Sequence, residues 1–302
     1  MKLNGLVAAP FTPLQRDGSL NLGQIEQYSA MLVANGVSGA FICGTTGEGA
    51  SLTTAERMQV AERWVSAAPR ELKVIVHVGH ASLADCRTLA QHAEKNRAHA
   101  VGCLAPYFFK PASIDDLVSF CAEVAAAAPA VPFYYYHMPS ITGVSFSMAD
   151  FLAAAENRIP TLAGIKFTYE NLMDYERCVS FSGGRYDILF GRDEMLLAGL
   201  ATGCRGAIGS SYNYAAPLYQ RLMAAFSAGD LDAARREQGR ANEMIAVMIR
   251  HGGLQAAKAI MGLIGLDCGP VRLPLRSLNA EQISALRADL EKCGFFEYRS
   301  RL

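Results

Sequence analysis

The sequence alternates about eight times between a short apolar run and a longer segment of helical periodicity. The apolar runs are rich in Val, Ile and aromatic residues and lack the polar alternation of a strand with one face in water. Such strands, each followed by a crossover helix, indicate a parallel sheet covered by helices. Eight units favour a closed (β/α)8 barrel, an α/β fold, over an open doubly wound sheet. We expect strands at residues 5–8, 39–43, 73–78, 100–105, 132–136, 162–167, 187–190 and 203–208.

The helical segments carry capping and amphipathic signals. In residues 53–68, Thr53 or Thr54 can cap the helix and Glu56 supports its first turn, while residues 82–96 carry one apolar stripe. After residue 227 only helical segments follow, and no Pro-, Ser- or Gly-rich linker precedes them. We predict a barrel over residues 1–227 and a helical extension over residues 228–302, packed together as one structural unit. The helices of the extension are expected at residues 230–249, 253–265 and 280–292.

Composition excludes several classes of function. The chain has 302 residues, 51% of them hydrophobic, and its 28 Lys and Arg balance 28 Asp and Glu, so no charged surface points to nucleic acid or an anionic membrane. The eight cysteines show no Cys-x-x-Cys pair and no Cys/His metal spacing, and we expect them as reduced core residues. Neither a leader-like N-terminus nor an 18-residue apolar segment occurs, and we expect a cytoplasmic protein without membrane contact.

Lys166 is the only charged residue in the apolar run 162–167. Burial disfavours the charged form of lysine, so a buried amine titrates below its ordinary pKa and can attack a ketone to form an iminium. The position alone is also compatible with a lysine that pairs with a carboxylate or reaches water at the strand end, because lysines are rarely buried unpaired.

Polar residues follow the second strand, at the barrel end where (β/α)8 enzymes carry their chemistry. Residues 44–49 read GTTGEG, whose glycines permit a tight turn. The hydroxyls of Thr45 and Thr46, with neighbouring backbone N–H groups, can hold a small anion such as a carboxylate. A turn with a helix-capping threonine explains the same residues. Neither a phosphate-loop nor a dinucleotide-binding glycine pattern is present, which disfavours nucleotide binding.

The fifth strand continues into FYYYHMP at residues 133–139. Strand alternation places Tyr134 and Tyr136 on one face and Tyr135 on the other. A phenol at the rim could shuttle protons, although tyrosines in a strand more often serve packing. We interpret His137 as a hydrogen-bonded rim residue rather than a base.

Polar side chains also follow the sixth, seventh and eighth strands. Thr168 shares the face of Lys166, which places a hydroxyl beside the amine. Residues 191–194 read GRDE; Asp193 could cap the next helix, but Asp193 and Glu194 at a strand mouth also suit a polyhydroxylated ligand. The eighth strand is followed by Ser210 in a small, hydroxyl-bearing segment.

Three motifs, in this order, resemble the pyruvate-dependent class I aldolases of the dihydrodipicolinate synthase and N-acetylneuraminate lyase superfamily. They are GTTGE at residues 44–48, the Y-x-x-P-x-x-T-G turn at residues 136–143, and the strand-borne Lys166. Each stands at the end of the expected strand, and the resemblance spans nearly the whole chain. It implies a (β/α)8 barrel in which Lys166 is the Schiff-base lysine.

Within this superfamily the N-acetylneuraminate lyase branch is the most similar, through residues 133–139, 164–168, 208–213 and 269–275. The synthase branch has an arginine two residues after the proline of the tyrosine turn, which holds the aldehyde substrate's carboxylate; this chain has Ile141 there. The synthase also has a tyrosine that reaches a neighbouring subunit's site, where this chain has Phe108. The synthase proton relay is therefore incomplete here, which the lyase branch tolerates.

The resemblance implies reversible cleavage of N-acetylneuraminate to N-acetylmannosamine and pyruvate. Lys166 condenses with the C2 ketone, the C3–C4 bond breaks, and Tyr136 is the general acid/base. Thr45 and Thr46 would hold the substrate carboxylate. The implied contacts to the sugar chain are Thr168, Gly191, Asp193, Glu194 and Ser210. The resemblance implies no metal or organic cofactor, because the Schiff base between Lys166 and pyruvate withdraws the electrons, and it implies a homotetramer.

Three alternatives remain at this point. A sister aldolase for a shorter sugar acid, such as 2-keto-3-deoxygluconate, would use the same lysine and tyrosine. Dihydrodipicolinate synthase is disfavoured by Ile141. A non-catalytic sugar-acid-binding protein could share the barrel, since fold alone does not decide function, but the presence of both Lys166 and Tyr136 argues against it.

Overall fold

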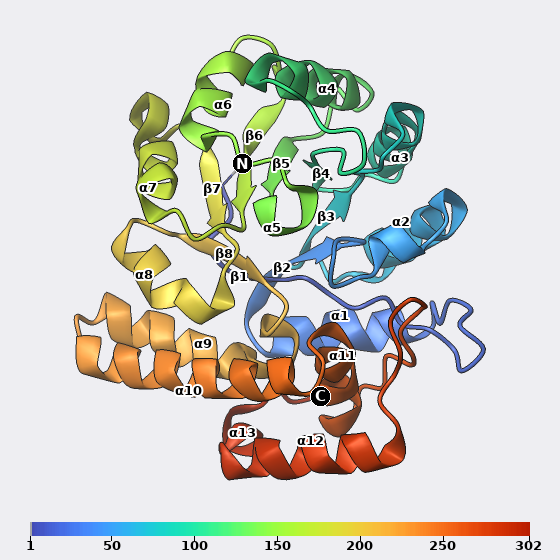
Figure 1. The fold of residues 1–302 in the computed structure, drawn as a ribbon, viewed down its shortest axis with the longest axis vertical. Helices are drawn as coiled ribbons and strands as arrows, with labels where there is room; N and C mark the ends of the chain where they lie inside the picture. The colour runs from blue at the N-terminus through green and yellow to red at the C-terminus, as the bar shows by residue number, and fades with distance from the viewer. Residues whose placement is uncertain (1) are drawn as a thin grey trace.

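Eight short parallel strands close into a barrel in the computed structural model, which describes residues 2–302 (Figure 1). Each strand pairs with the next one along the chain, and β8 pairs with β1 to close the sheet. This confirms the (β/α)8 architecture expected from the alternation of apolar runs and helical segments. The strands are β1 (Gly5–Ala8), β2 (Val37–Ile42), β3 (Lys73–His77), β4 (Ala100–Leu104), β5 (Phe133–His137), β6 (Leu162–Phe167), β7 (Asp187–Phe190) and β8 (Gly206–Gly209).

Two strands begin more than one residue away from the expected position. Strand β2 begins at Val37 rather than at residue 39, because Val37 already pairs with Leu6 of β1. Strand β8 begins at Gly206 rather than at residue 203. The N–H groups of Gly203 and Cys204 donate to carbonyls of the preceding helix, so these residues end that helix instead of opening the strand. An apolar run in the sequence does not by itself show whether its N–H groups end a helix or pair with a neighbouring strand.

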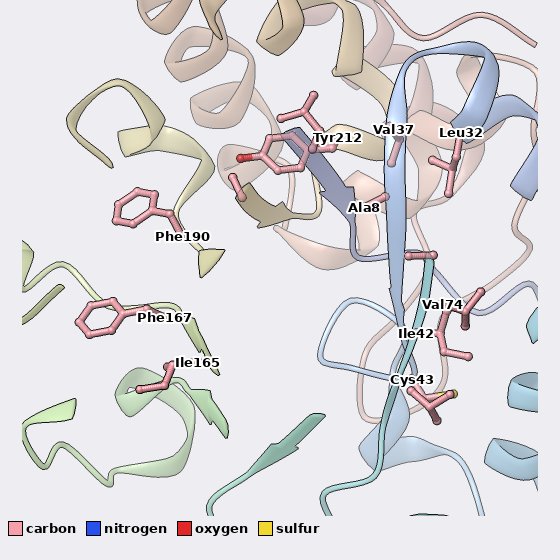
Figure 2. Packing of buried hydrophobic residues seen from close by; sticks show 14 of the residues in the cluster. Ala8, Leu32, Val37, Ile42, Cys43, Val74, Ile165, Phe167, Phe190 and Tyr212 are labelled. Atoms are coloured by element: carbon pink, nitrogen blue, oxygen red, sulfur yellow. The ribbon is translucent and has the colours of Figure 1, made fainter. Parts of the chain in front are cut away.

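The side chains of each strand alternate between the barrel interior and the surrounding helices. On β6, Ile165 and Phe167 belong to the larger apolar cluster, between strands and helices. Figure 2 shows Phe167 and Phe190 on the side of their strands that faces away from the barrel axis. Lys166 lies between two outward-facing neighbours and therefore points inward. The interior is filled by a smaller cluster that includes Val7, Phe41, Ile75, Tyr134, Tyr136, Leu189 and Ile208.

Helices cover the outside of the barrel, and their starts follow the capping signals in the sequence. Thr53 caps α2: its side chain accepts from the N–H of Glu56, whose carboxylate accepts from the N–H of Thr53. Ser82 caps α3 through its side chain alone, which accepts from the N–H of Asp85. The helices of the barrel are α1 (Gln24–Ala34), α2 (Thr54–Ala67), α3 (Leu83–Lys95), α4 (Ile114–Ala126), α5 (Pro139–Thr142), α6 (Met148–Ala155), α7 (Leu172–Ser180), α8 (Leu196–Ala201) and α9 (Tyr212–Ser227). Short 3-10 turns lie at Gly49–Ser51, Phe181–Gly184 and Asp193–Met195.

The C-terminal helices gather on one side of the barrel, beside α1 and α8 (Figure 1). They are α10 (Leu231–Arg250), α11 (Leu254–Leu263), α12 (Ala280–Lys292) and α13 (Phe295–Tyr298). The first three lie within two residues of their expected positions, whereas the sequence reading did not include the four-residue α13. The expected division of the chain at residue 227 falls at the end of α9.

A buried ion pair connects this extension to the barrel. Lys258 of α11 and Glu48, in the loop after β2, approach to 2.7 Å between Nζ and Oε1, and each side chain is only 2% exposed. Lys258 also donates to the carbonyl of Pro270 at 2.6 Å, and Glu48 accepts from the N–H of Arg272 at 2.8 Å. Because both charges are paired and hydrogen-bonded, the cost of burying them is largely offset.

We expect Lys258→Met to lower the free energy of unfolding by about 3–5 kcal/mol, because it leaves the Glu48 carboxylate buried without its cation. Urea denaturation of the two proteins measures this difference. The matched control is Lys292→Met, which removes a lysine from an exposed pair with Asp289 and should leave the unfolding free energy nearly unchanged. Equal losses in the two variants would show that the buried pair does not hold the extension in place.

All eight cysteines are free thiols, and seven of them are buried, as expected for reduced core residues; Cys293 is half-buried. None of the helices described for residues 2–302 combines the length and apolar character that a membrane-spanning helix needs.

Candidate active site

A pocket of about 270 Å³ lies at the C-terminal end of the barrel strands. All nine site residues named from the sequence line it, and they come from the ends of five strands and the loops that follow them. The pocket residues from that group are Thr45, Thr46, Tyr136, Lys166, Thr168, Gly191, Asp193, Glu194 and Ser210. Their shared location is the position that a (β/α)8 barrel offers for chemistry.

Lys166 is buried in the barrel interior without a counter-charge. Its Nζ lies 4.1 Å from the ring centroids of both Phe41 and Tyr136, and it forms no ion pair within residues 2–302. Burial lowers the pKa of Lys166 to about 7, and the negative charge of Asp193 opposes that shift. The alternative of a lysine neutralised by a carboxylate describes Lys258 in this chain, not Lys166.

Tyr136 lies directly beside Lys166, because the two residues are partners in the register of β5 and β6. Its ring meets Phe41 edge-on at 5.3 Å between centroids, and its hydroxyl lies 3.4 Å from Thr45 Oγ1 and donates to Met138 Sδ at 2.9 Å. Burial raises the pKa of Tyr136 to about 12, while the nearby Thr45 hydroxyl lowers it. The group is therefore a neutral phenol at pH 7, able to donate a proton. As expected, Tyr135 faces the opposite way, into the outer cluster.

The GTTGEG loop after β2 presents hydroxyls and backbone N–H groups to the pocket. Thr45 is exposed and Thr46 is buried, and neither N–H donates to a backbone carbonyl within residues 2–302. The loop is tight, with Cys43 and Glu48 in the left-handed region at φ 57° and 54°. Glu48, the acidic residue of the motif, turns away to Lys258, so its role is structural. The two threonines and their free N–H groups are suited to an anion.

Thr168 and Gly191 form the part of the pocket nearest the end of β6. The N–H of Thr168 donates to the carbonyl of His137 at 2.8 Å, whereas its buried Oγ1 has no partner within residues 2–302. A Cβ at position 191 would overlap the Thr168 hydroxyl. Gly191 is therefore required sterically, because it leaves room for that hydroxyl beside the end of β7.

Asp193 is buried and held by the residue after Ser210. The N–H and Oγ of Ser211 donate to Asp193 Oδ2 at 2.9 and 2.5 Å, and a Cβ at Gly209 would overlap the carboxylate. Burial raises the pKa of Asp193 to about 6, although the Ser211 hydrogen bonds oppose the shift. One oxygen is thus occupied by Ser211, which the sequence reading did not single out. The alternative that Asp193 caps the next helix is wrong, because neither the turn Asp193–Met195 nor α8 begins with a side-chain cap and the carboxylate binds Ser211 instead.

Arg192 and the C-terminal helices complete the pocket. Arg192 pairs with Glu194 and with Glu170, which lies in the loop after β6. Met248 of α10 and Leu254 of α11 line the side of the pocket formed by the extension. Met248 and Leu254 could not be recognised from the sequence, because an apolar residue in an amphipathic helix looks the same whether it covers a sheet or faces a ligand.

The interpretation of His137 is corrected by the structure. His137 is fully buried, and neither ring nitrogen has a hydrogen-bond partner within residues 2–302. It faces the outer cluster, packed against Tyr135, Phe167 and Tyr169 with ring centroids 5.2–6.1 Å away. Burial lowers the pKa of His137 to about 4, so the ring is neutral at pH 7. His137 is a packing residue rather than a hydrogen-bonded residue of the rim.

The two positions at which the chain departs from the synthase pattern lie outside the pocket lining. Ile141 is 57% exposed on α5, and Phe108 is 75% exposed in the loop after β4, edge-on to Phe109. Within residues 2–302 no group of three or more His, Cys, Asp and Glu side chains is arranged to hold a metal ion.

Comparisons with known proteins agree with this geometry. The model of the dihydrodipicolinate synthetase family matches residues 2–293. A Mus musculus protein named N-acetylneuraminate lyase is 44% identical over 299 residues, which cover 97% of this chain and 93% of the mouse protein. The solved Proteus mirabilis N-acetylneuraminate lyase has a TM-score of 0.95 at 45% identity, over 98% of this chain and 100% of that one. A Ruminococcus gnavus sialic acid aldolase, solved as a catalytic lysine mutant, has a TM-score of 0.92 at 26% identity, over 98% and 99% of the two chains.

Proposed function

Since the chain belongs to the dihydrodipicolinate synthetase family, we propose that it is a Schiff-base aldolase that cleaves N-acetylneuraminate reversibly to N-acetylmannosamine and pyruvate. The observation that carries the chemistry is the unpaired, buried amine of Lys166 directly beside the phenol of Tyr136. The substrate follows from the relatives, which are named N-acetylneuraminate lyase and align with nearly the whole chain. Because Ile141 is apolar, it offers no partner for the second carboxylate that the synthase reaction requires.

The reaction begins when the substrate carboxylate binds at the loop after β2. Thr45 and Thr46 offer hydroxyls and free N–H groups there, which places the adjacent C2 ketone toward Lys166. The free amine attacks C2, and the carbinolamine loses water to form an iminium. The apolar walls around Nζ, including the ring of Phe41, lower the pKa of the amine to about 7, so a large fraction is the free nucleophile at neutral pH.

Cleavage of the C3–C4 bond follows from the iminium. The electron pair of that bond moves toward the iminium nitrogen and leaves an enamine of pyruvate, while the C4 hydroxyl loses its proton as the aldehyde forms. Because Tyr136 is a neutral phenol, we assign it a relay: its oxygen accepts the C4 hydroxyl proton as its own hydroxyl proton passes to the substrate carboxylate. In the condensation direction both transfers run in reverse. Protonation of the enamine and hydrolysis of the iminium release pyruvate and restore Lys166.

The remaining pocket residues would bind the polyhydroxylated chain of the sugar. Asp193 and Glu194 offer carboxylate oxygens that accept from hydroxyls, and Thr168 and Ser210 offer hydroxyls of their own. Gly191 lets the chain approach the backbone. Covalent catalysis by Lys166 supplies the electron withdrawal, so we propose that neither metal nor organic cofactor takes part. We also propose a homotetramer in the cytoplasm; the exposed Phe108 and Phe109 support a contact between copies.

The function is tested by assaying the purified enzyme with N-acetylneuraminate. Pyruvate and N-acetylmannosamine should appear in equal amounts, and borohydride with pyruvate should leave a reduced adduct on the Lys166 peptide. A shorter 2-keto-3-deoxy sugar acid and the pair of pyruvate and aspartate semialdehyde are the competing substrates. If either reacts faster than N-acetylneuraminate is cleaved, the substrate assignment is wrong, although the Schiff-base chemistry would stand.

The pH dependence of adduct formation gives an independent prediction. Only the free amine attacks the ketone, so the rate of trapping by pyruvate should rise with pH and level off above a midpoint of about 7, the pKa of Lys166. Asp193→Asn should move the midpoint to lower pH, because the charge of Asp193 favours the ammonium form. Rapid-quench borohydride trapping across the pH range measures both midpoints. A midpoint near 10 in the unmodified protein would mean that the amine is solvated rather than buried.

A further inference from the structure

Arg192 is the only cationic side chain besides Lys166 among the pocket-lining residues within residues 2–302. Its guanidinium is bound on two sides by carboxylates: Nη1 lies 3.4 Å from Glu194 Oε1, and Nη2 pairs with Glu170 Oε1. The side chain is 19% exposed, and its buried Nε has no partner within residues 2–302. Arg192 therefore joins the loop after β6 to the loop after β7 at the rim of the pocket.

This arrangement orders Glu194 before any substrate arrives. The Glu194 side chain is 39% exposed and has no other ion-pair partner within residues 2–302. A half-exposed glutamate retains much of its rotamer freedom, and a hydroxyl that binds it must immobilise it. Because Arg192 is itself held by Glu170 through Nη2, its Nη1 contact to Glu194 Oε1 restrains that carboxylate in advance.

The charges at this end of the pocket also select among ligands. Arg192 is outnumbered by its two paired carboxylates, and Asp193 adds a third acidic group beside them. A phosphorylated or otherwise anionic chain end would meet net negative charge here and be repelled. A neutral polyhydroxylated chain donates hydrogen bonds to the same carboxylates, so it suits this end.

We propose that Arg192 is a positioning residue that sets specificity for the neutral polyhydroxylated chain of the substrate, by holding the Glu194 carboxylate between the two loops. The inference rests on the proposed function and deepens it. It concerns only the sugar end of the pocket, because the pyruvate end is formed by Lys166, Tyr136 and the two threonines after β2.

The test measures the condensation of pyruvate with N-acetylmannosamine by Arg192→Met. The variant should raise KM for N-acetylmannosamine ~10-fold with kcat changed less than ~2-fold, because ground-state and transition-state binding of the chain are lost together. The pyruvate concentration for half-maximal borohydride trapping should not change. Arg192→Lys keeps the charge without the fork and should recover part of the loss. Glu170→Gln should raise the same KM by a smaller factor, since it loosens Arg192 alone.

The matched control is Arg185→Met, which removes an arginine from an exposed pair with Glu156 outside the pocket. It should change neither KM for N-acetylmannosamine nor the pyruvate concentration for half-maximal trapping. An unchanged KM for N-acetylmannosamine in Arg192→Met and Glu170→Gln overturns the inference. An equal rise in the pyruvate concentration for half-maximal borohydride trapping overturns it as well. Thermal unfolding of each variant identifies misfolding; if Arg192→Met does not fold, Arg192→Lys and Glu170→Gln still decide. Absence of the Lys166 adduct in the unmodified enzyme would instead contradict the proposed function.

Discussion

Lys166→Met is expected to reduce cleavage of N-acetylneuraminate by at least ~10⁴-fold and to abolish borohydride trapping by pyruvate, because no other lysine lines the pocket in the described part of the chain. Methionine fills the same space against the rings of Phe41 and Tyr136, so the pocket should keep its shape. Turnover assays and mass analysis of the reduced protein measure the two losses. The control is Lys73→Met, at the opposite end of the barrel on β3, which should retain full activity.

The same substitution should stabilise the fold. The pKa of Lys166 is lowered to about 7 from an ordinary value of 10.5, so the unfolded chain binds its proton more readily than the folded chain does. This costs stability most below pH 7, and the cost disappears as pH rises through 10.5. Lys166→Met should therefore raise the thermal midpoint more at pH 6 than at pH 10. A variant that is inactive and also less stable would point to a structural lysine, and an adduct that persists would place the Schiff base elsewhere.

Tyr136→Phe is expected to slow turnover by ~10²- to 10⁴-fold while the Lys166 adduct still forms, because it removes the proton carrier but not the amine. The phenyl ring keeps its edge-on contact with Phe41, so pocket packing should be preserved. Trapping with pyruvate and steady-state turnover, measured on one preparation, separate the two steps. Loss of both together would make Tyr136 a positioning residue for Lys166 instead.

The adjacent tyrosine provides the matched control. Tyr135 precedes Tyr136 in β5 but faces the outer cluster, and its buried hydroxyl has no partner within residues 2–302. Tyr135→Phe removes the same atom from the same strand and should leave turnover unchanged. Equal slowing of the two variants would show that strand packing, rather than proton transfer, explains the effect. An unimpaired Tyr136→Phe enzyme would remove the acid/base role.

Much of the site could be predicted because its residues sit at fixed points of a repeating pattern. Strand alternation put Thr168 on the face of Lys166 and Tyr134 on the face of Tyr136, and the parallel order of the strands placed the strand ends together at one end of the barrel. The glycines after β2 indicated a tight turn. The prediction of a hydrogen bond for His137 was wrong for a related reason. Alternation places His137 on the face of Tyr135, but whether a hydrogen-bond partner lies there depends on helices whose positions the strand pattern does not give.

Other features required the folded chain. Arg192 stands in the sequence between a glycine and two acids, and nothing local indicates that Glu170, from the preceding loop, holds it. The sequence singled out Glu48 with its loop, yet its partner Lys258 lies 210 residues away. Met248 and Leu254 reach the pocket only because α10 and α11 pack over the barrel end.

The sequence by itself determined the succession of eight strands, the face that Lys166 shares with Thr168 and the set of polar residues at the strand ends. Those properties follow from backbone periodicity and apolar patterning, which are local. Only the tertiary structure decided that Lys258 is paired with a carboxylate whereas Lys166 is buried without one. That difference separates a structural lysine, which keeps its charge, from a nucleophile, whose pKa is lowered. The pKa of a buried amine depends on which charges surround it in space, and the packing of distant segments decides that.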